Sequence, residues 1–223
     1  MSILGSGHRS FLFWDGRADS LWAQALEPLE NPSEHNFTRT EIVSYVQEAY
    51  ISEMNILGIP PVPEAKRIIA SPLGNRKQKA VWDALPHKVK SEINHSFASI
   101  GKVIAAYEAN LPVPYAEWEG ILIGLKKKNH ATFANLDAIM SGFRLFSGKA
   151  RCASCHNGPL FTDGDFHNIG MPSLENSLPD LGKQSVVLKL LSNPFNCLGE
   201  YSDALPEKCN GLLYQNRSIE RSF

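Results

Sequence analysis

The stretch "RCASCHNGPL", residues 151–160, holds two cysteines three positions apart and a histidine directly after the second cysteine. Cys152, Cys155 and His156 thus form a C-x-x-C-H motif, which is the attachment signature for c-type haem. Two thiols at this spacing can add across the two vinyl groups of one porphyrin, and the next residue then lies beneath the ring. We interpret the cysteines as anchors of one haem c and His156 as a ligand of its iron.

Three other interpretations of the motif stay open. A structural zinc site needs a second pair of ligands, and Cys197 and Cys209, which flank the loop "LGEYSDALPEK", do not have the spacing of such a pair. A thioredoxin-like motif follows a strand, whereas a helical pattern precedes this one. The pattern can also arise by chance. Whether Cys197 and Cys209 form a disulfide depends on the redox compartment, so the sequence leaves that open.

Hydrophobic periodicity predicts an all-α fold, because steps of three and four residues recur and strict alternation is nearly absent. Thr38 and Glu41 have the spacing of a capping box, and Gly148 follows a helical pattern as an expected C-cap. The expected helices cover residues 20–29, 38–50, 87–111 and 133–148.

The two longer patterns predict which side chains face a core. In the helix over 87–111 these are Val89, Ile93, Phe97, Ile100, Ile104 and Tyr107. In the helix over 133–148 they are Phe133, Leu136, Met140, Phe143 and Phe146. The segment "GFRLFSGKARCASCHNGPLF" resembles the first helix of a cytochrome c fold, in which an aromatic residue near the helix end packs against the haem edge. This resemblance implies that role for Phe143 or Phe146, although each also suits an ordinary helix core.

Composition limits the function classes. With 223 residues, 43% of them hydrophobic, the chain can bury a sizeable core. The 22 basic and 23 acidic side chains nearly cancel, which argues against nucleic acid as a partner. No apolar run approaches the ~20 residues that span a bilayer. The start, "MSILGSGHRSFLFWDGR", does not have the pattern of a signal peptide.

Two long blocks resemble the bacterial di-haem cytochrome c peroxidases, a family that includes the enzyme maturing a tryptophan-derived quinone cofactor. They are "LFWDGRADSLWAQALEPLENPSEH", residues 12–35, and "GFRLFSGKARCASCHNGPLFTDGDFHNIG", residues 142–170. The resemblance implies two cytochrome c-like helical domains, the first incomplete in this chain. Residues 1–112 would be a remnant of the N-terminal, peroxidatic domain, and residues 113–223 the C-terminal electron-transfer domain.

The resemblance also assigns roles to single residues. It implies that the haem held by the C-x-x-C-H motif is the one that receives electrons and passes them on. Trp14 matches a tryptophan that lies between the two haems of the family and helps to couple them. Gln24, Pro28 and Glu34 match residues of the peroxidatic pocket, where the matching glutamate is the acid–base catalyst of O–O cleavage.

Each of these residues has a plainer interpretation. Trp14 would be a core aromatic residue on composition alone, and Gln24 a polar residue of a helix surface. Glu34 would be an exposed loop acid or a cap for the next helix. His167, beyond the haem motif, either donates a hydrogen bond to a haem propionate or is an ordinary loop histidine.

The chain departs from the family at both ends. The family's first C-x-x-C-H lies upstream of the "FWDGR" block, and the residues before that block contain no cysteine. His8 is too isolated to replace the missing motif. We therefore expect one covalent haem here, against two in the family, and no calcium. The second axial ligand of the family lies past residue 223, and Met171 is a conceivable substitute.

Three hypotheses of function follow. The first is a peroxidase that reduces hydrogen peroxide with electrons from a small cytochrome c or a cupredoxin. This activity is not expected of the chain alone unless a partner supplies the missing haem. The second is a mono-haem electron-transfer module or inactive fragment, and the third a cytoplasmic chain without haem. Because haem attachment occurs outside the bacterial cytoplasm, the full-length protein is expected in the periplasm, with a homodimer among its states.

Overall fold

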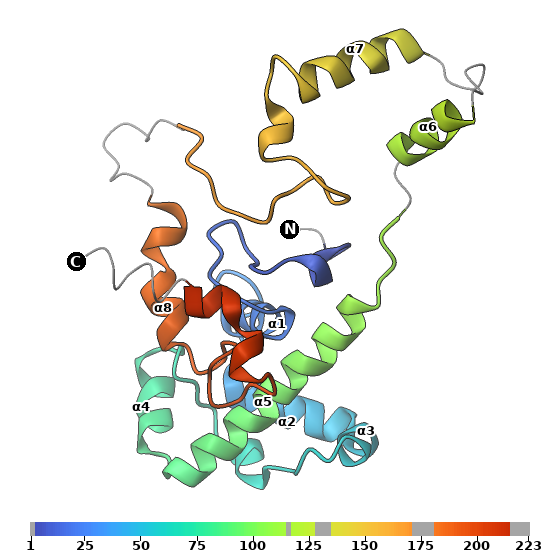
Figure 1. Cartoon of the computed structure of the whole chain (residues 1–223). Helices are drawn as coiled ribbons and strands as arrows, with labels where there is room; N and C mark the ends of the chain where they lie inside the picture. The colour runs from blue at the N-terminus through green and yellow to red at the C-terminus, as the bar shows by residue number, and fades with distance from the viewer. Residues whose placement is uncertain (1–2, 115–116, 128–134, 171–180, 215–223) are drawn as a thin grey trace. The chain divides into compact units, whose positions relative to one another are not determined.

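A computed structural model describes residues 3–114, 117–127, 135–170 and 181–214 of the chain (Figure 1). Within these ranges the structure is helical, and the only β pairing is an isolated bridge between Leu12 and Ala18. The prediction of an all-α fold is therefore confirmed. The α-helices are α1 (Leu21–Glu30), α2 (Arg39–Ala49), α3 (Ile51–Ile56), α4 (Arg76–Ala84), α5 (His87–Ala109), α6 (Glu117–Lys126), α7 (Leu136–Ser147) and α8 (Val187–Ser192).

The chain divides into two compact units, each described here by itself. Unit 1 combines Met1–Asn110 with Glu175–Phe223, and unit 2 is Leu111–Leu174. The first cut falls at the start of the "LPVP" segment. These units do not coincide with the predicted domains, residues 1–112 and 113–223, because unit 1 includes the segment Glu175–Phe223. The assignment of two cytochrome c-like domains stays a prediction.

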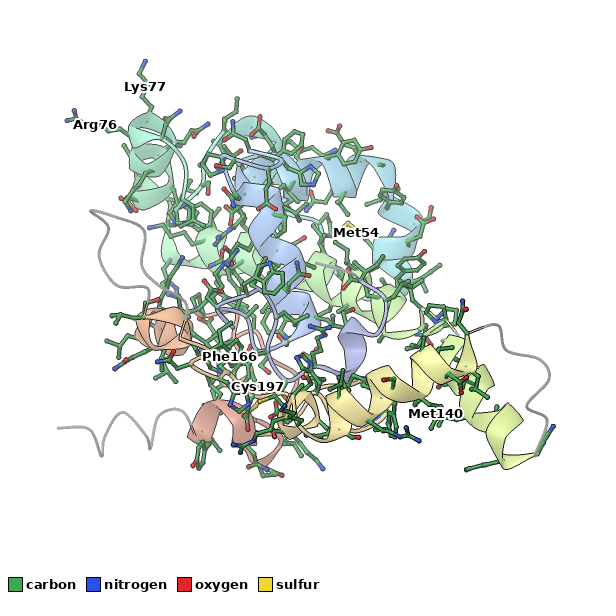
Figure 2. All side chains as sticks on the ribbon, turned by 90° about the horizontal axis from the view of Figure 1, so that it is seen from above. Met54, Arg76, Lys77, Met140, Phe166 and Cys197 are labelled. Carbon is green, nitrogen blue, oxygen red and sulfur yellow. A yellow bond between two sulfur atoms is a disulfide. The ribbon has the colours of Figure 1, made fainter. Side chains whose placement is uncertain are left out.

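Capping side chains begin three helices of unit 1. The Thr38 side chain accepts a hydrogen bond from the backbone N–H of Glu41, whose carboxylate accepts one from the Thr38 N–H, so the predicted capping box is confirmed. Asn75 and Gln78 form the same arrangement at α4. Ser20 caps α1. Figure 2 shows the first turn of α4 extending Arg76 and Lys77 away from the helices.

The core of unit 1 forms where α1 packs against α5 (Figure 1). Ile93 and Phe97 of α5 are fully buried there, as the periodicity predicts. A Cβ atom at Gly101 would lie 2.6 Å from the carbonyl oxygen of Trp22, so only glycine permits this close approach. The predicted face does not continue to the end of α5, since Tyr107 is 67% exposed.

A buried ion pair lies beside this core. Arg39 Nη2 donates to Glu30 Oε2 at 2.5 Å, and both side chains are almost inaccessible to solvent. The Ser71 hydroxyl donates to the other oxygen of Glu30, and Arg39 Nη1 donates to Asn94 Oδ1 at 2.7 Å. The guanidinium carbon lies about 5 Å from the ring centroids of three aromatic residues, Trp82, Phe97 and Phe195. The pair is thus held by hydrogen bonds and cation–π contacts.

The segment after residue 181 completes unit 1. Phe195 packs edge-on against Phe97 and Trp22 and stacks with Tyr201. Cys197 and Cys209 form a disulfide, which settles the question that the sequence leaves open. Among the described residues, no helix combines the length and apolar character that a membrane crossing requires.

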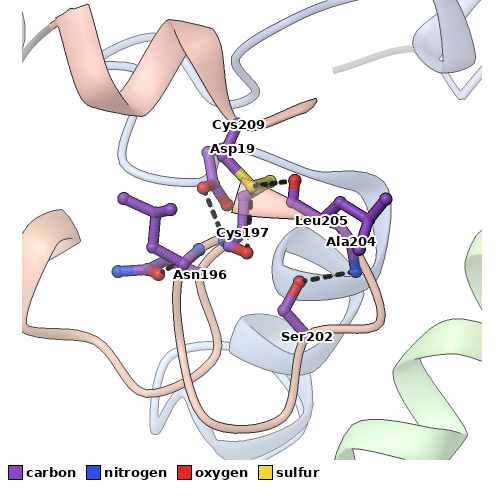
Figure 3. The surroundings of a disulfide bond; sticks show 8 residues. Asp19, Asn196, Cys197, Ser202, Ala204, Leu205 and Cys209 are labelled. Atoms are coloured by element: carbon purple, nitrogen blue, oxygen red, sulfur yellow. Dashed lines mark hydrogen bonds between the residues drawn. A yellow bond between two sulfur atoms is a disulfide. The ribbon is translucent and has the colours of Figure 1, made fainter. Parts of the chain in front are cut away.

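Asp19 connects the disulfide loop to the start of α1 (Figure 3). Its Oδ2 accepts a hydrogen bond from the Cys197 N–H at 2.7 Å, whereas Oδ1 is buried without a partner among the described residues. Burial raises the pKa of Asp19 above its ordinary value of 3.8, and the Cys197 hydrogen bond only partly opposes that effect.

We expect the charge on Asp19 to lower the stability of unit 1 as the pH rises. Because its pKa is higher in the folded chain than in the unfolded one, the native state binds more protons between the two values. The free energy of unfolding should therefore fall as the pH rises from about 4 through the raised pKa, and Asp19→Asn should remove this decline. Urea unfolding at several pH values between 4 and 7 measures the free energy of unfolding of wild type and Asp19→Asn. Asp83→Asn, at an exposed position, is the control. Equal dependence of the free energy of unfolding on pH in wild type and Asp19→Asn would contradict the prediction.

Candidate functional site

The C-x-x-C-H motif lies directly after α7, in a short 3₁₀ turn over Cys152–Ser154. Gly148 is the C-cap of α7, as predicted. A Cβ atom there would lie 2.7 Å from the Arg144 carbonyl oxygen, so glycine is required. The chain then reverses at Arg151, whose φ of 58° lies in the left-handed region. This reversal places both cysteines in one turn immediately beyond the helix.

Backbone hydrogen bonds hold the motif residues together. The N–H groups of Cys155 and His156 both donate to the Cys152 carbonyl oxygen, at 3.3 and 2.9 Å. Both thiols are free and half-buried. The described residues around the motif, 135–170, include no strand, so the setting of a thioredoxin-like motif is absent there.

The imidazole of His156 is oriented by the loop that follows it. Its Nδ1 lies 3.1 Å from the Phe161 carbonyl oxygen, which can only accept a hydrogen bond. Nδ1 therefore carries the proton, and Nε2 keeps a free lone pair for a metal. Positive φ angles at Gly158 and Phe161 turn the loop back to make this contact. The sequence argument missed the Phe161 carbonyl, because a backbone acceptor leaves no residue-type signal.

The next turn of the loop carries Asp163 and His167. The Asp163 N–H donates to the Cys155 carbonyl oxygen at 3.0 Å, and Asp163 Oδ2 lies 2.8 Å from His167 Nε2. A hydrogen bond from the Asp165 N–H, together with the contact to His167, lowers the pKa of Asp163, so the carboxylate is ionised near neutrality. The propionate role of His167 stays a prediction, and Asp163 is its partner in this structure.

The aromatic residues of α7 do not form a buried core, which corrects the predicted face of this helix. None of its residues is buried. Phe143 is 41% exposed and stacks on Trp118 of α6, with ring centroids 5.2 Å apart. Phe146 contacts Phe161 edge-on at 6.0 Å. Phe133 and Met171 lie outside the described residues.

Unit 2 presents apolar surface near the motif. Among its described residues, Ile121 is the only buried hydrophobic side chain. A set of apolar side chains on α7 and in the loop after the motif is 40–79% exposed: Phe143, Leu145, Leu160, Phe161, Phe166 and Ile169. A porphyrin needs such apolar contacts, together with two thiols and an oriented imidazole. The residues present therefore fit a covalently attached haem.

The structure places Trp14 on the surface, with 94% of its side chain exposed, so its interpretation as a core aromatic residue is wrong. It lies in a tight turn with positive φ angles at Phe13 and Gly16. Arg17 closes this turn by donating to Asp15 at 3.0 Å and stacking over Phe13. An exposed indole suits contact with another group, and the coupling role of Trp14 stays a prediction.

Gln24 and Glu34 lie on α1 and on the turn after it. Gln24 is half-buried, and no described hydrogen bond joins it to Glu34. Glu34 is exposed, and its carboxylate accepts a hydrogen bond from the Asn31 side chain at 2.7 Å. The His35 N–H donates to the Pro28 carbonyl oxygen, which folds this turn against the end of α1. Because Thr38 caps α2, Glu34 is not a helix cap. Their pocket roles stay predictions.

Comparisons with known proteins point to one family. The model of the di-haem cytochrome c peroxidases matches residues 1–127. The methylamine utilization protein MauG of Methylorubrum extorquens is 29% identical over 71% of this chain and 35% of its own length. The cytochrome-c peroxidase IdrP1 of Denitromonas iodatirespirans is 28% identical over 83% of this chain and 39% of its own. The cytochrome c551 peroxidase of Nitrosomonas europaea is 26% identical over 83% of this chain and 45% of its own.

The chain thus spans less than half the length of these curated relatives. No solved structure matches it significantly. The matched family model covers the "FWDGR" block, α1 and α5, and two of the three relatives align with 83% of the chain. The family model alone accounts for more than half of the 223 residues. The chain therefore belongs to the di-haem cytochrome c peroxidase family.

Proposed function

We propose that this chain binds one haem c through Cys152, Cys155 and His156 and transfers electrons in the reduction of hydrogen peroxide. The observation that carries the proposal is the contact between His156 Nδ1 and the Phe161 carbonyl oxygen, which leaves Nε2 available as an iron ligand. The family and the exposed apolar side chains of unit 2 support it.

Bound at this site, haem would supply a one-electron redox centre. The residues of the chain have separate tasks around it. Cys152 and Cys155 would hold it covalently, since each thiol could add its S–H across one vinyl group, with the sulfur on one carbon and the hydrogen on the other. The Phe161 carbonyl oxygen holds the His156 imidazole through Nδ1, and Phe143 and Phe146 would offer apolar contacts to a bound porphyrin.

The peroxidatic half of the proposed function would belong to residues 1–112. Peroxide cleavage requires a proton to move between two oxygens, and a carboxylate within reach can carry it. Glu34 is our candidate for that role and Gln24 for a polar group beside it, as the resemblance implies. Trp14, on the exposed turn, is our candidate for coupling two redox centres. A small cytochrome c or a cupredoxin would deliver the electrons.

A periplasmic location is part of the proposal. The Cys197–Cys209 disulfide is typical of an oxidising compartment, and attachment of haem to C-x-x-C-H also occurs outside the cytoplasm. A mono-haem electron-transfer module is the second candidate, favoured by the single C-x-x-C-H motif in the 223 residues.

Covalent haem content tests the proposal directly. We expect the full chain, exported in a host that attaches c-type haem, to stain for haem on a denaturing gel and to give about one haem per chain in a pyridine haemochrome assay. Cys152→Ser with Cys155→Ser should abolish the stain because no thioether can form. Cys197→Ser with Cys209→Ser is the matched control and should keep it. Colourless wild-type protein with reactive thiols at 152 and 155 would refute the proposal.

A further inference from the structure

Three ligands of different chemistry meet on one side of the motif. The Cys155 sulfur, an Asp163 carboxylate oxygen and an imidazole nitrogen of His167 all lie within 4.8 Å of one another. Within the described part of the chain this is the one group of three or more such side chains that are close enough to hold a metal ion. Cys152 and His156 do not belong to it, although both are close in sequence.

The loop holds the three residues together by hydrogen bonds. The Asp163 N–H donates to the Cys155 carbonyl oxygen at 3.0 Å, which fixes the distance between the first two ligands. Asp163 Oδ1 accepts from the Asp165 N–H at 3.0 Å, so Oδ2 is directed to His167 Nε2 at 2.8 Å. The His156 ring is engaged instead with the Phe161 carbonyl oxygen.

This donor set matches a zinc-class ion. Thiolate, imidazole and carboxylate are the three ligand types that zinc accepts, and three protein ligands with water in the fourth position are a common arrangement. With bonds of about 2.0–2.3 Å, tetrahedral ligands lie roughly 3.3–3.6 Å apart. The most distant pair of atoms, within 4.8 Å at present, must therefore approach by roughly 1.2–1.5 Å, whereas Asp163 Oδ2 and His167 Nε2 must separate by roughly 0.5–0.8 Å. The three residues lie outside the helices, where the backbone can make such shifts. The ion would replace the proton now shared by Asp163 and His167.

We propose that the haem-free chain binds one zinc-class divalent ion through Cys155, Asp163 and His167, and that this ion and covalent haem exclude each other. On binding, the Cys155 thiol releases its proton to solvent and the thiolate ligates the metal. After haem attachment the same sulfur is an uncharged thioether, so the site loses its only thiolate. The exclusion rests on the proposed haem function, whereas metal binding to the haem-free chain does not.

Cobalt is the probe for this site, because Co²⁺ replaces zinc and its thiolate complexes absorb in the near ultraviolet. The full chain is produced in the cytoplasm, where no haem is attached, and titrated with Co²⁺. We expect one ion per chain with a thiolate charge-transfer band that Zn²⁺ abolishes by displacement. Cys155→Ser should remove the band, and Asp163→Asn and His167→Ala should each weaken binding at least ~10-fold. Asp165→Asn and Cys152→Ser are the controls and should bind as wild type.

The outcomes separate this site from its alternatives. The absence of a cobalt–thiolate band would overturn the proposal, because Cys155 would then not be a ligand. A band lost in Cys152→Ser and His156→Ala but kept in Asp163→Asn would place the metal on the C-x-x-C-H residues and would also overturn it. The haem-loaded chain should show no band, and a band that persists there would overturn the exclusion. A failed haem stain alongside a normal cobalt titration would refute the proposed function while leaving the metal site intact.

Discussion

Replacing Arg39 with alanine is expected to destabilise unit 1 by about 3–5 kcal/mol, because it leaves the Glu30 carboxylate buried and unpaired. The substitution also removes the cation–π contacts with Trp82, Phe97 and Phe195. Urea unfolding followed by tryptophan fluorescence measures the loss. No other ion pair among the described residues of unit 1 has both partners almost fully buried, so no comparable effect is expected from those pairs.

The double variant Arg39→Met with Glu30→Met is the control for this prediction. It removes both charges while keeping apolar volume, so it should lose much less stability than Arg39→Ala. Lys79→Ala, which breaks an exposed pair with Asp83, should cost under about 1 kcal/mol. If Arg39→Ala and Lys79→Ala lower the free energy of unfolding equally, the buried pair does not have the role assigned to it.

Replacing His156 with glycine is expected to change the redox centre without releasing it. Both thioethers would remain, so the haem stain should persist. Axial ligands set haem potentials over a range of about 0.8 V, and loss of the imidazole should shift the midpoint potential by roughly 0.1–0.3 V. The rate of electron transfer from a reduced donor to the haem should decrease as well. Spectroelectrochemical titration of the exported chain measures the shift.

Added imidazole provides the control, because it fills the space of the missing ring and should restore much of the wild-type spectrum and potential. His167→Ala, which keeps the His156 side chain and its contact with Phe161, should shift the potential much less. An unchanged midpoint potential in His156→Gly would show that this imidazole is not the ligand.

The elements that are predictable from sequence are those with a local signal. The capping box of Thr38 and Glu41, the apolar stripe of α5 and the glycine after α7 each depend on residues within a few positions of one another. Helix α4 has no such stripe, since Trp82 is its only buried residue, and the sequence argument does not predict it. Helix α6 follows the "LPVP" segment, and the sequence argument does not predict this helix either.

The candidate site also has features that a local sequence signal predicts and features that it does not. The spacing of Cys152, Cys155 and His156 predicts haem attachment, because that chemistry depends on the spacing itself; this stays a prediction. The exposure of Trp14 is not predictable, since it results from the closing of its turn by Arg17 onto Asp15. The approach of Asp163 to Cys155 depends on a backbone hydrogen bond across the loop.

Unit 1 is assembled from both ends of the sequence, and this has a consequence for the order of events during synthesis. The aromatic residues around Arg39 include Phe195, which emerges from the ribosome long after α2. Until then the Arg39–Glu30 pair has only part of its enclosure, and we expect unit 1 to complete its folding late. Cys152 and Cys155 emerge earlier than Phe195. The C-x-x-C-H motif is therefore synthesised before the residues that complete the enclosure of the Arg39–Glu30 pair.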